Sequence, residues 1–237
     1  MDYTYLDCLA LFGVGGAHPG GLQLTRNLLS SEKIDETTSV LDVGCGTGQT
    51  SSYIAEQYKC KVTALDCNKL MLDKAKQRFS SLHLPIEVKQ GSSEDLPFDE
   101  ASFDMILSES VISFTDVSLT IPEMKRVLKP KGVLLAIEMV LEKSISEEES
   151  EKISNFYGFS QLRTESEWYN YFQKAGFKQI SAKKSNLPFD KNDVQNAPDF
   201  SLSEKIDDEF YDIFAEHEHL TKVYKDALGF RVFRCCE

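Results

Sequence analysis

A short apolar run that ends in closely spaced glycines constrains the fold of this chain more than any other feature. Residues 40–43 (VLDV) are mostly aliphatic and β-branched, which predicts a buried strand. Gly44, Gly46 and Gly48 follow the run, and helix-like residues begin at Thr50. Glycines after a strand let backbone N–H groups approach a ligand that side chains would otherwise keep away. The run therefore predicts a ligand-binding turn between a strand and a helix.

The spacing of these glycines separates two kinds of ligand that such a turn can bind. A dinucleotide-binding turn has glycine at its first, third and sixth positions. Here the third glycine, Gly48, stands at the fifth position, and Gln49 occupies the sixth. Asp42 precedes the turn, and its carboxylate would repel a pyrophosphate but attract an ammonium group. Both departures favour S-adenosylmethionine, which carries an ammonium group and no phosphate, over the nicotinamide cofactor of an oxidoreductase.

Strand-like and helix-like patterns alternate along the first part of the chain. We predict strands over 40–43, 61–65, 86–89, 103–107 and 133–139, and helices over 50–58 and 68–82, the second capped by Asn68. A further helix is predicted to begin near Pro122, with proline in its first turn, and to end near Leu128. Such alternation implies right-handed crossovers and a doubly wound, mostly parallel α/β sheet.

The remaining segments lie before and after this alternation. Helices are expected over 5–12 and 22–29, on either side of glycine-rich residues 13–21. Later helices are expected within 142–152, over 164–175 and, as one long amphipathic helix or two, over 202–228. Strands are expected over 177–183 and 229–235, an irregular aromatic segment over 154–161, and a polar loop over 186–201.

The composition fits one cytoplasmic domain. The chain has 237 residues, of which 41% are apolar, and its formal net charge is −12. Its basic residues are scattered, so we expect no nucleic-acid partner. No apolar run approaches the roughly 20 residues that span a membrane, and residues 1–10 lack the Lys or Arg of a secretory signal. The six cysteines form no C-x-x-C pair, which predicts reduced thiols and no metal site.

Four blocks in this order resemble the class I S-adenosylmethionine-dependent methyltransferases, close to their small-molecule branch. The blocks are residues 40–49, 62–71, 91–108 and 125–138. The resemblance implies a Rossmann-like fold with a seven-stranded sheet and helical cap insertions. It also implies methyl transfer from S-adenosyl-L-methionine to N, O, S or C of a small-molecule acceptor, with S-adenosyl-L-homocysteine as product.

The resemblance also implies a division of the single domain, residues 1–237. The N-terminal helices and their glycine-rich loop are expected within 1–35, and the cofactor-binding core within 36–140. Insertions that form a lid or bind the acceptor are expected over 141–163 and 186–228. The acceptor itself is not specified by the sequence, and either a monomer or a homodimer is compatible with it.

The methionine end of the cofactor is expected at the tips of the first and fourth predicted strands. The resemblance assigns Asp42 to the ammonium group and the glycine turn, with Gly44, Cys45 and Gly46, to the adjoining atoms. The carbonyl of Ser108 is expected to accept a hydrogen bond from the same ammonium group. An alternative for Asp42 is that it only caps the turn.

The nucleoside end of the cofactor is expected at the tip of the second strand. Asp66 follows the glycine turn by about 20 residues, where a carboxylate accepts hydrogen bonds from both ribose hydroxyls; the alternative is a helix-capping turn with Asn68. Cys67 and Met71 are expected against one adenine face, although ordinary core residues would look the same.

The adenine edge is the part where the sequence departs from the family. The family's usual acid is replaced by Ser92, a weaker hydrogen-bond acceptor, and Ser93 would offer its backbone N–H. Glu94 or Asp95 would supply the missing acid if the loop shifts.

Two residues are candidates for the acceptor side of the reaction. Glu109 follows the fourth strand and is expected to orient or deprotonate the acceptor, with a helix N-terminal charge interaction as the alternative. His18, in the glycine-rich loop, is a candidate base or acceptor clamp; the alternative is a solvated side chain. His217 and His219 are expected at the surface, with a role in the lid as the alternative. Because no strong base stands out, a cofactor-binding sensor or scaffold without catalysis is the alternative function.

Overall fold

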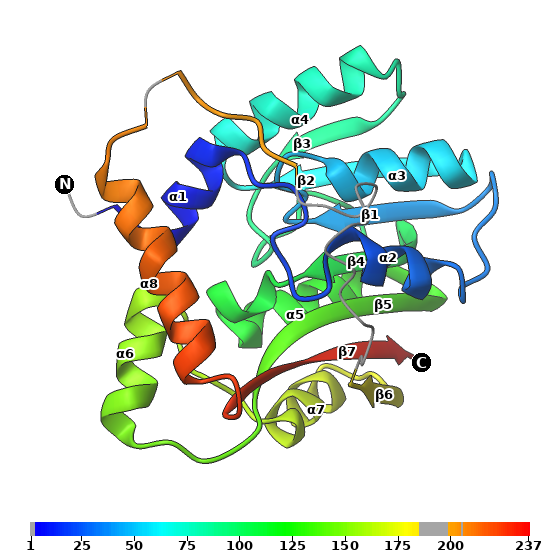
Figure 1. Cartoon of the computed structure of the whole chain (residues 1–237). Helices are drawn as coiled ribbons and strands as arrows, with labels where there is room; N and C mark the ends of the chain where they lie inside the picture. The colour runs from blue at the N-terminus through cyan, green and yellow to red at the C-terminus, as the bar shows by residue number, and fades with distance from the viewer. Residues whose placement is uncertain (1–2, 185–198, 205) are drawn as a thin grey trace.

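The computed structural model describes residues 3–184, 199–204 and 206–237 (Figure 1). In chain order its elements are α1 (Tyr5–Phe12), α2 (Gly21–Leu29), β1 (Ser39–Val43), α3 (Gln49–Tyr58), β2 (Lys61–Asp66), α4 (Lys69–Ser81), β3 (Glu87–Gln90), β4 (Phe103–Glu109), the 3₁₀ turn η1 (Ile112–Phe114), α5 (Val117–Val127), β5 (Leu128–Leu141), α6 (Glu147–Tyr157), α7 (Glu165–Lys174), β6 (Gln179–Lys183), α8 (Glu209–Val223) and β7 (Leu228–Cys236).

The strands form one seven-stranded sheet in the order β3-β2-β1-β4-β5-β7-β6. The pairs from β3 to β5 are parallel, and β7 runs antiparallel to both β5 and β6. The predicted mostly parallel α/β sheet is confirmed. The strand order reverses direction at β1 and β4, and in open α/β sheets ligands bind outside the carboxyl ends of the strands at such a point.

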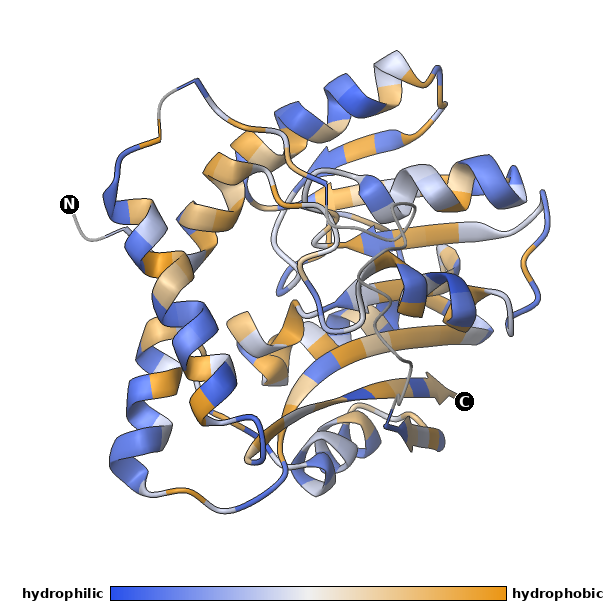
Figure 2. Ribbon diagram, viewed as in Figure 1, coloured by the Kyte–Doolittle hydropathy of each residue, from blue (hydrophilic) through white to orange (hydrophobic). Residues whose placement is uncertain are grey.

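Helices cover both faces of the sheet because successive side chains of each strand point to opposite faces. Val40 of β1 packs with Ile54 of α3 and Leu29 of α2 on one face. Leu41 packs with α5 and α7 on the other face. Figure 2 shows the strands coloured mostly as hydrophobic and the outward sides of the helices as hydrophilic. The sheet is therefore doubly wound, as predicted.

Three helices form a separate layer at the carboxyl edge of the parallel strands. We call α1, α6 and α8 the cap; they lie together on the left of Figure 1. Tyr5 of α1 shares an apolar cluster with Tyr157 of α6 and Leu220 of α8. A second cluster joins Phe12 of α1 to Phe210 of α8. The cap is thus held together by its own apolar contacts beyond the sheet.

The local signals at most helix starts are confirmed. Asn68 caps α4, and its side chain accepts from the backbone N–H groups of Leu70 and Met71. The helix over 164–175 begins with a capping box between Thr164 and Glu167. These caps satisfy donors that the first helical turn leaves without a partner.

Two expected helix boundaries are wrong. The helix near Pro122 begins earlier, at Val117, because Asp116 caps it through the Ser118 N–H. Pro122 therefore lies inside the helix and not in its first turn. It has no N–H group to donate to the carbonyl four residues earlier, so the helix lacks one hydrogen bond there. Helix α6 continues to Tyr157 through residues expected to be irregular, and Gly158 ends it in the left-handed conformation, with φ +83°.

The helix expected over 202–228 is shorter than predicted. It covers only Glu209–Val223, and Leu228 already belongs to β7. Val223, its last residue, is exposed. Residues 186–198 of the expected polar loop lie outside the described residues. Among the helices of the described ranges, none is long and apolar enough to cross a membrane.

Replacement of Leu41 with Ala should lower the free energy of unfolding by about 2–5 kcal/mol, because Leu41 is fully buried between the sheet and α5. Leu119→Ala is the matched control: Leu119 on α5 is half exposed, and its loss should cost about 0.5 kcal/mol or less. Urea denaturation of both variants measures the difference. Equal losses would contradict the assigned orientation of β1.

Candidate functional site

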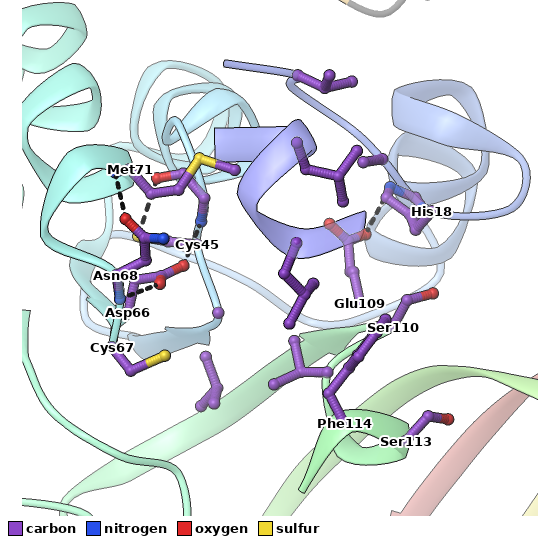
Figure 3. A pocket seen from close by; sticks show the side chains of 18 of the residues that line it. His18, Cys45, Asp66, Cys67, Asn68, Met71, Glu109, Ser110, Ser113 and Phe114 are labelled. Carbon is purple, nitrogen blue, oxygen red and sulfur yellow. Dashed lines mark hydrogen bonds and ion pairs between the residues drawn. The ribbon is translucent and has the colours of Figure 1, made fainter. Parts of the chain in front are cut away.

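A cavity of about 710 Å³ lies between the tips of β1, β2 and β4 and the cap. Figure 3 shows Asp66, Asn68 and Met71 on one side of it and His18 with Glu109 on the other. Both candidate catalytic residues, His18 and Glu109, line it. Nine of the ten expected cofactor residues also line it, namely Asp42, Gly44, Cys45, Gly46, Asp66, Cys67, Met71, Ser92 and Ser93.

Backbone geometry explains the glycine turn. Gly44, Gly46 and Gly48 have φ of +70°, +53° and +77°, a left-handed conformation that favours glycine. A side chain at Gly44 would collide with Val111. At Gly46, nothing described lies within 4 Å of where a Cβ would stand. The turn therefore leaves an open space against its backbone for a ligand.

Asp42 is a buried carboxyl at the tip of β1. Only 2% of the residue is exposed, and its Oδ2 accepts from the Ser51 hydroxyl on α3. Burial, followed by the nearby charge of Glu109, raises the pKa of Asp42 to about 7. No Lys or Arg of the described residues is among the groups that influence this pKa. A buried carboxyl without a cationic partner is costly to ionise.

Asp66 ends β2 beside the glycine turn. Its Oδ2 accepts from the Gly46 N–H at 2.9 Å and its Oδ1 from the Asn68 N–H at 2.8 Å. The second hydrogen bond forms the capping turn with Asn68 that was the alternative interpretation of Asp66 in the sequence. Burial raises the pKa of Asp66 against the effect of these bonds. Each oxygen keeps a lone pair that a further donor can use.

The expected adenine end has serines at the cavity wall. Ser92 and Ser93 line the cavity, whereas Glu94 and Asp95 do not. The Glu94 carboxylate instead accepts from the Asp116 N–H at 2.8 Å, so it is held at the start of α5. The structure therefore gives no support to Glu94 as the replacement for the missing acid.

Ser108 does not line the cavity. It is fully buried in the sheet between Val43 of β1 and Ala136 of β5, and its hydroxyl has no hydrogen-bond partner in the described part of the chain. Its expected carbonyl contact stays a prediction.

Glu109 is the centre of a polar network that joins three segments. The hydroxyls of Thr25 on α2 and Thr50 on α3 donate to its carboxylate, the second at 2.8 Å. His18 Nε2 lies 3.4 Å from Glu109 Oε1. Only 2% of the His18 side chain is exposed, so the alternative of a solvated loop histidine is wrong. The network fixes the N-terminal loop over the tip of β4.

A second cover for the cavity comes from residues after the undescribed segment. The carbonyl of Asp199 accepts from the Gly15 N–H at 2.9 Å, and its carboxylate pairs with Arg78 at 2.6 Å. Arg78 Nε in turn donates to the carbonyl of Thr47 in the glycine turn at 2.8 Å. These contacts connect Asp199 to the N-terminal loop at Gly15 and, through Arg78, to the glycine turn.

Glu138 on β5 positions the wall after β4, and sequence reasoning missed it. Its carboxylate accepts from the backbone N–H groups of Val111, Ile112 and Ser113 and from the Ser113 hydroxyl. Burial raises its pKa to about 7. The wall residue Ser110 has φ +58°, a strained conformation. A lone acid inside an apolar strand was the available signal.

The cap closes the far end of the cavity with aromatic rings. Tyr5, Tyr157, Phe159 and Phe214 line this end, with Phe114 from η1. His217 also lines it, so the expectation that it lies at the surface is wrong. The apolar face of α8 turns His217 inward, whereas His219 is exposed. Within the described residues no group of three metal-ligating side chains occurs.

Replacement of Asp42 with Asn should change how stability depends on pH in the ligand-free protein. The wild-type carboxyl titrates near 7 when folded and near 3.9 when unfolded. Between these values the native state holds a proton that the unfolded state releases, so wild-type stability falls as pH rises. Asn holds no proton but keeps an oxygen for Ser51. The stability of the variant relative to wild type should rise from pH 4 to pH 7 by on the order of 2–4 kcal/mol, measured by urea denaturation.

Asp73→Asn is the control for this experiment. Asp73 lies on α4, and the side-chain hydrogen bond from Lys69 lowers its pKa. Its ionised form therefore stabilises the native state above the unfolded pKa, and the variant's relative stability should fall as pH rises. A flat or falling profile for Asp42→Asn would contradict the assigned environment of Asp42.

Comparisons with known proteins agree on one family. Residues 41–136 match the family described as "Methyltransferase domain". The chain is 40% identical over 229 residues to YodH, an uncharacterized methyltransferase of Bacillus subtilis (strain 168), and the match covers 97% of each chain.

Solved structures show the same fold. Phosphoethanolamine N-methyltransferase 2 of Haemonchus contortus, in complex with S-adenosyl-L-methionine, gives a TM-score of 0.77 at 20% identity, covering 99% of this chain and 57% of that one. The MccD protein gives 0.73 at 16% identity, covering 94% and 100%. At these identities the likeness concerns the fold alone. With the nearly full-length match to YodH, it follows that the chain belongs to the class I S-adenosylmethionine-dependent methyltransferase family.

Proposed function

We propose that this enzyme transfers a methyl group from S-adenosyl-L-methionine to a small-molecule acceptor. The observation that carries the proposal is the buried Asp42 carboxyl, without a described cationic partner, beside a glycine turn that leaves open space at Gly46. An ammonium group in that space would supply the missing positive charge. The residues present therefore fit the donor on grounds independent of the family.

Asp42 and the glycine turn would hold the methionine end of the donor, and Asp66 would bind its ribose. Asp66 already receives two backbone N–H groups, and its remaining lone pairs suit two adjacent hydroxyls. Cys67, Met71, Ser92 and Ser93 would surround the adenine, and the Ser108 carbonyl would serve the ammonium group.

When bound, the donor would supply an electrophilic methyl group: the electron pair of the broken S–CH₃ bond stays on sulfur, and an electron pair of the acceptor forms the new bond. A neutral acceptor that carries a hydrogen on the reacting atom then loses that proton. The chain's task is to align the reacting atoms and to exclude water. His18 and Glu109 suit this task because they hold the N-terminal loop over the cavity. We assign them a role in orienting the acceptor.

The segments around the core would form the lid. Residues 1–35 and 141–163, with the described part of 186–228, contribute to the cavity wall or to the cap. The proposal covers N, O, S or C as the acceptor atom. It is compatible with a monomer or a homodimer. One structural neighbour is named phosphoethanolamine N-methyltransferase 2, and phosphoethanolamine is a small molecule. This name supports a small acceptor for the present chain.

A donor-binding module without catalysis is the second candidate, favoured by serine at position 92 in place of the usual acid. The family membership favours an enzyme instead. Incubation with S-adenosyl-L-methionine and a metabolite library, followed by mass spectrometry, separates the two. Any acceptor heavier by one methyl group supports catalysis, whereas donor binding without product from a broad library would favour the module.

Calorimetric titration with S-adenosyl-L-methionine tests the donor site. We expect micromolar binding to the wild type. Asp66→Ala should weaken it about tenfold to a hundredfold, because charge-assisted hydrogen bonds are lost. Gly44→Val should also weaken it, since the side chain collides with Val111. Asp73→Ala, an exposed aspartate on α4, is the control and should bind as the wild type does. Absence of binding to the wild type would defeat the proposed function.

A further inference from the structure

The cap end of the cavity differs in chemistry from the strand tips. Its wall consists mainly of aromatic and aliphatic side chains from α1, η1, α6 and α8. By contrast, the titratable carboxyls that line the cavity, Asp42, Asp66 and Glu109, all lie at strand tips. A molecule at the cap end would meet rings and not charges.

Within the described part of the chain, no charged side chain lines the cap end, although Glu216 and Glu218 of α8 lie near enough outside the wall to act on Tyr157 and His217. No Lys or Arg of the described residues lines the cavity, so this wall offers no cation for a phosphate or carboxylate. Glu109, the cavity-lining carboxylate nearest in sequence to η1, already accepts from Thr25 and Thr50 and faces His18. A cationic amine would therefore find no free carboxylate among these side chains. Burial of either ion would be costly.

The rings at the cap end pack against one another and form a continuous wall. Tyr157 stacks on Phe159 at 5.2 Å between centroids and meets Tyr5 edge-on at 5.0 Å. Phe114 meets Phe159 at 4.8 Å with a steep angle of 62°. Tyr5 in turn stacks on His217 at 5.3 Å. Faces and edges in this arrangement suit a flat aromatic ligand, which gains from offset or edge-to-face contacts.

One polar pair interrupts this apolar wall. The Tyr157 hydroxyl lies 3.0 Å from His217 Nδ1, within hydrogen-bond distance. Burial lowers the pKa of His217 and raises that of Tyr157 to about 12, so both side chains are neutral near pH 7. When Tyr157 donates to His217, its oxygen keeps lone pairs for a further donor. The pair can therefore receive a hydroxyl group of a neutral ligand.

We propose that the methyl acceptor is an uncharged aromatic compound with a hydroxyl group. Its ring would pack among Tyr5, Phe114 and Phe159, and its hydroxyl would donate to Tyr157, which His217 orients. This inference rests on the proposed methyl transfer and adds the substrate class to it. Tyr157 is then the residue that determines specificity for a hydroxylated ring, and His217 is a positioning residue.

The test measures binding to the enzyme saturated with S-adenosyl-L-homocysteine. The probes are 2-naphthol, naphthalene, phosphoethanolamine and tetramethylammonium, titrated by calorimetry. We expect 2-naphthol to bind more tightly than the other three. Tyr157→Phe should weaken 2-naphthol about three- to tenfold while naphthalene is unaffected, because only one neutral hydrogen bond is lost. His217→Gln should weaken 2-naphthol less, since glutamine can still accept from Tyr157.

Tyr169→Phe is the matched control, because Tyr169 lies exposed on α7 and outside the cavity wall. It should leave every affinity unchanged. Tighter binding of phosphoethanolamine or tetramethylammonium than of 2-naphthol would overturn the inference, as would equal 2-naphthol affinity in Tyr157→Phe and wild type. In each of these cases S-adenosyl-L-homocysteine still binds and the proposed function stands. If that product itself fails to bind, the proposed function falls first.

Discussion

An uncompensated carboxyl at the tip of β1 is the constraint on which the rest of the site depends. Asp42 faces α3 because β1 alternates between the two faces of the sheet, and its neighbours Leu41 and Val43 are fully buried on the other side. Among the described residues, only Ser51 donates a hydrogen bond to its carboxylate. Under the proposed function, the ammonium group of the donor would compensate this carboxyl.

The same strand tips also hold the segments that cover the cavity. Glu109 binds hydroxyls from α2 and α3 and faces His18, while Arg78 connects the glycine turn to Asp199. Glu138 fixes the turn after β4 through three backbone N–H groups. Each link is an ionisable side chain that meets partners from a distant segment. The covers are therefore positioned by polar contacts with the core, while apolar contacts hold the cap together internally.

Sequence reasoning succeeded where a local rule decides the structure. The glycine turn, the sheet strands and the cap of α4 by Asn68 follow from residues adjacent in the chain. It failed where distant contacts decide. His217 points into the cavity because it packs against Tyr5 and Tyr157. Both residues lie far from α8 in the sequence, so the hydrophobic pattern of α8 does not predict these contacts. Glu138 likewise acts on residues more than twenty positions before it.

The two ends of the cavity are built in different ways, and under the proposed function this would separate donor recognition from acceptor recognition. The donor end is made by strand tips whose side chains are fixed by the sheet, so changes there disturb the core. The cap end draws its rings from α1, η1, α6, the residues just after α6, and α8, and several of these rings share one apolar cluster beyond the sheet. Replacement of a ring such as Phe159 alters the cap without touching β1 or β2. Under the proposed function, the same sheet would serve different acceptors, and the assembled cap would determine the acceptor class.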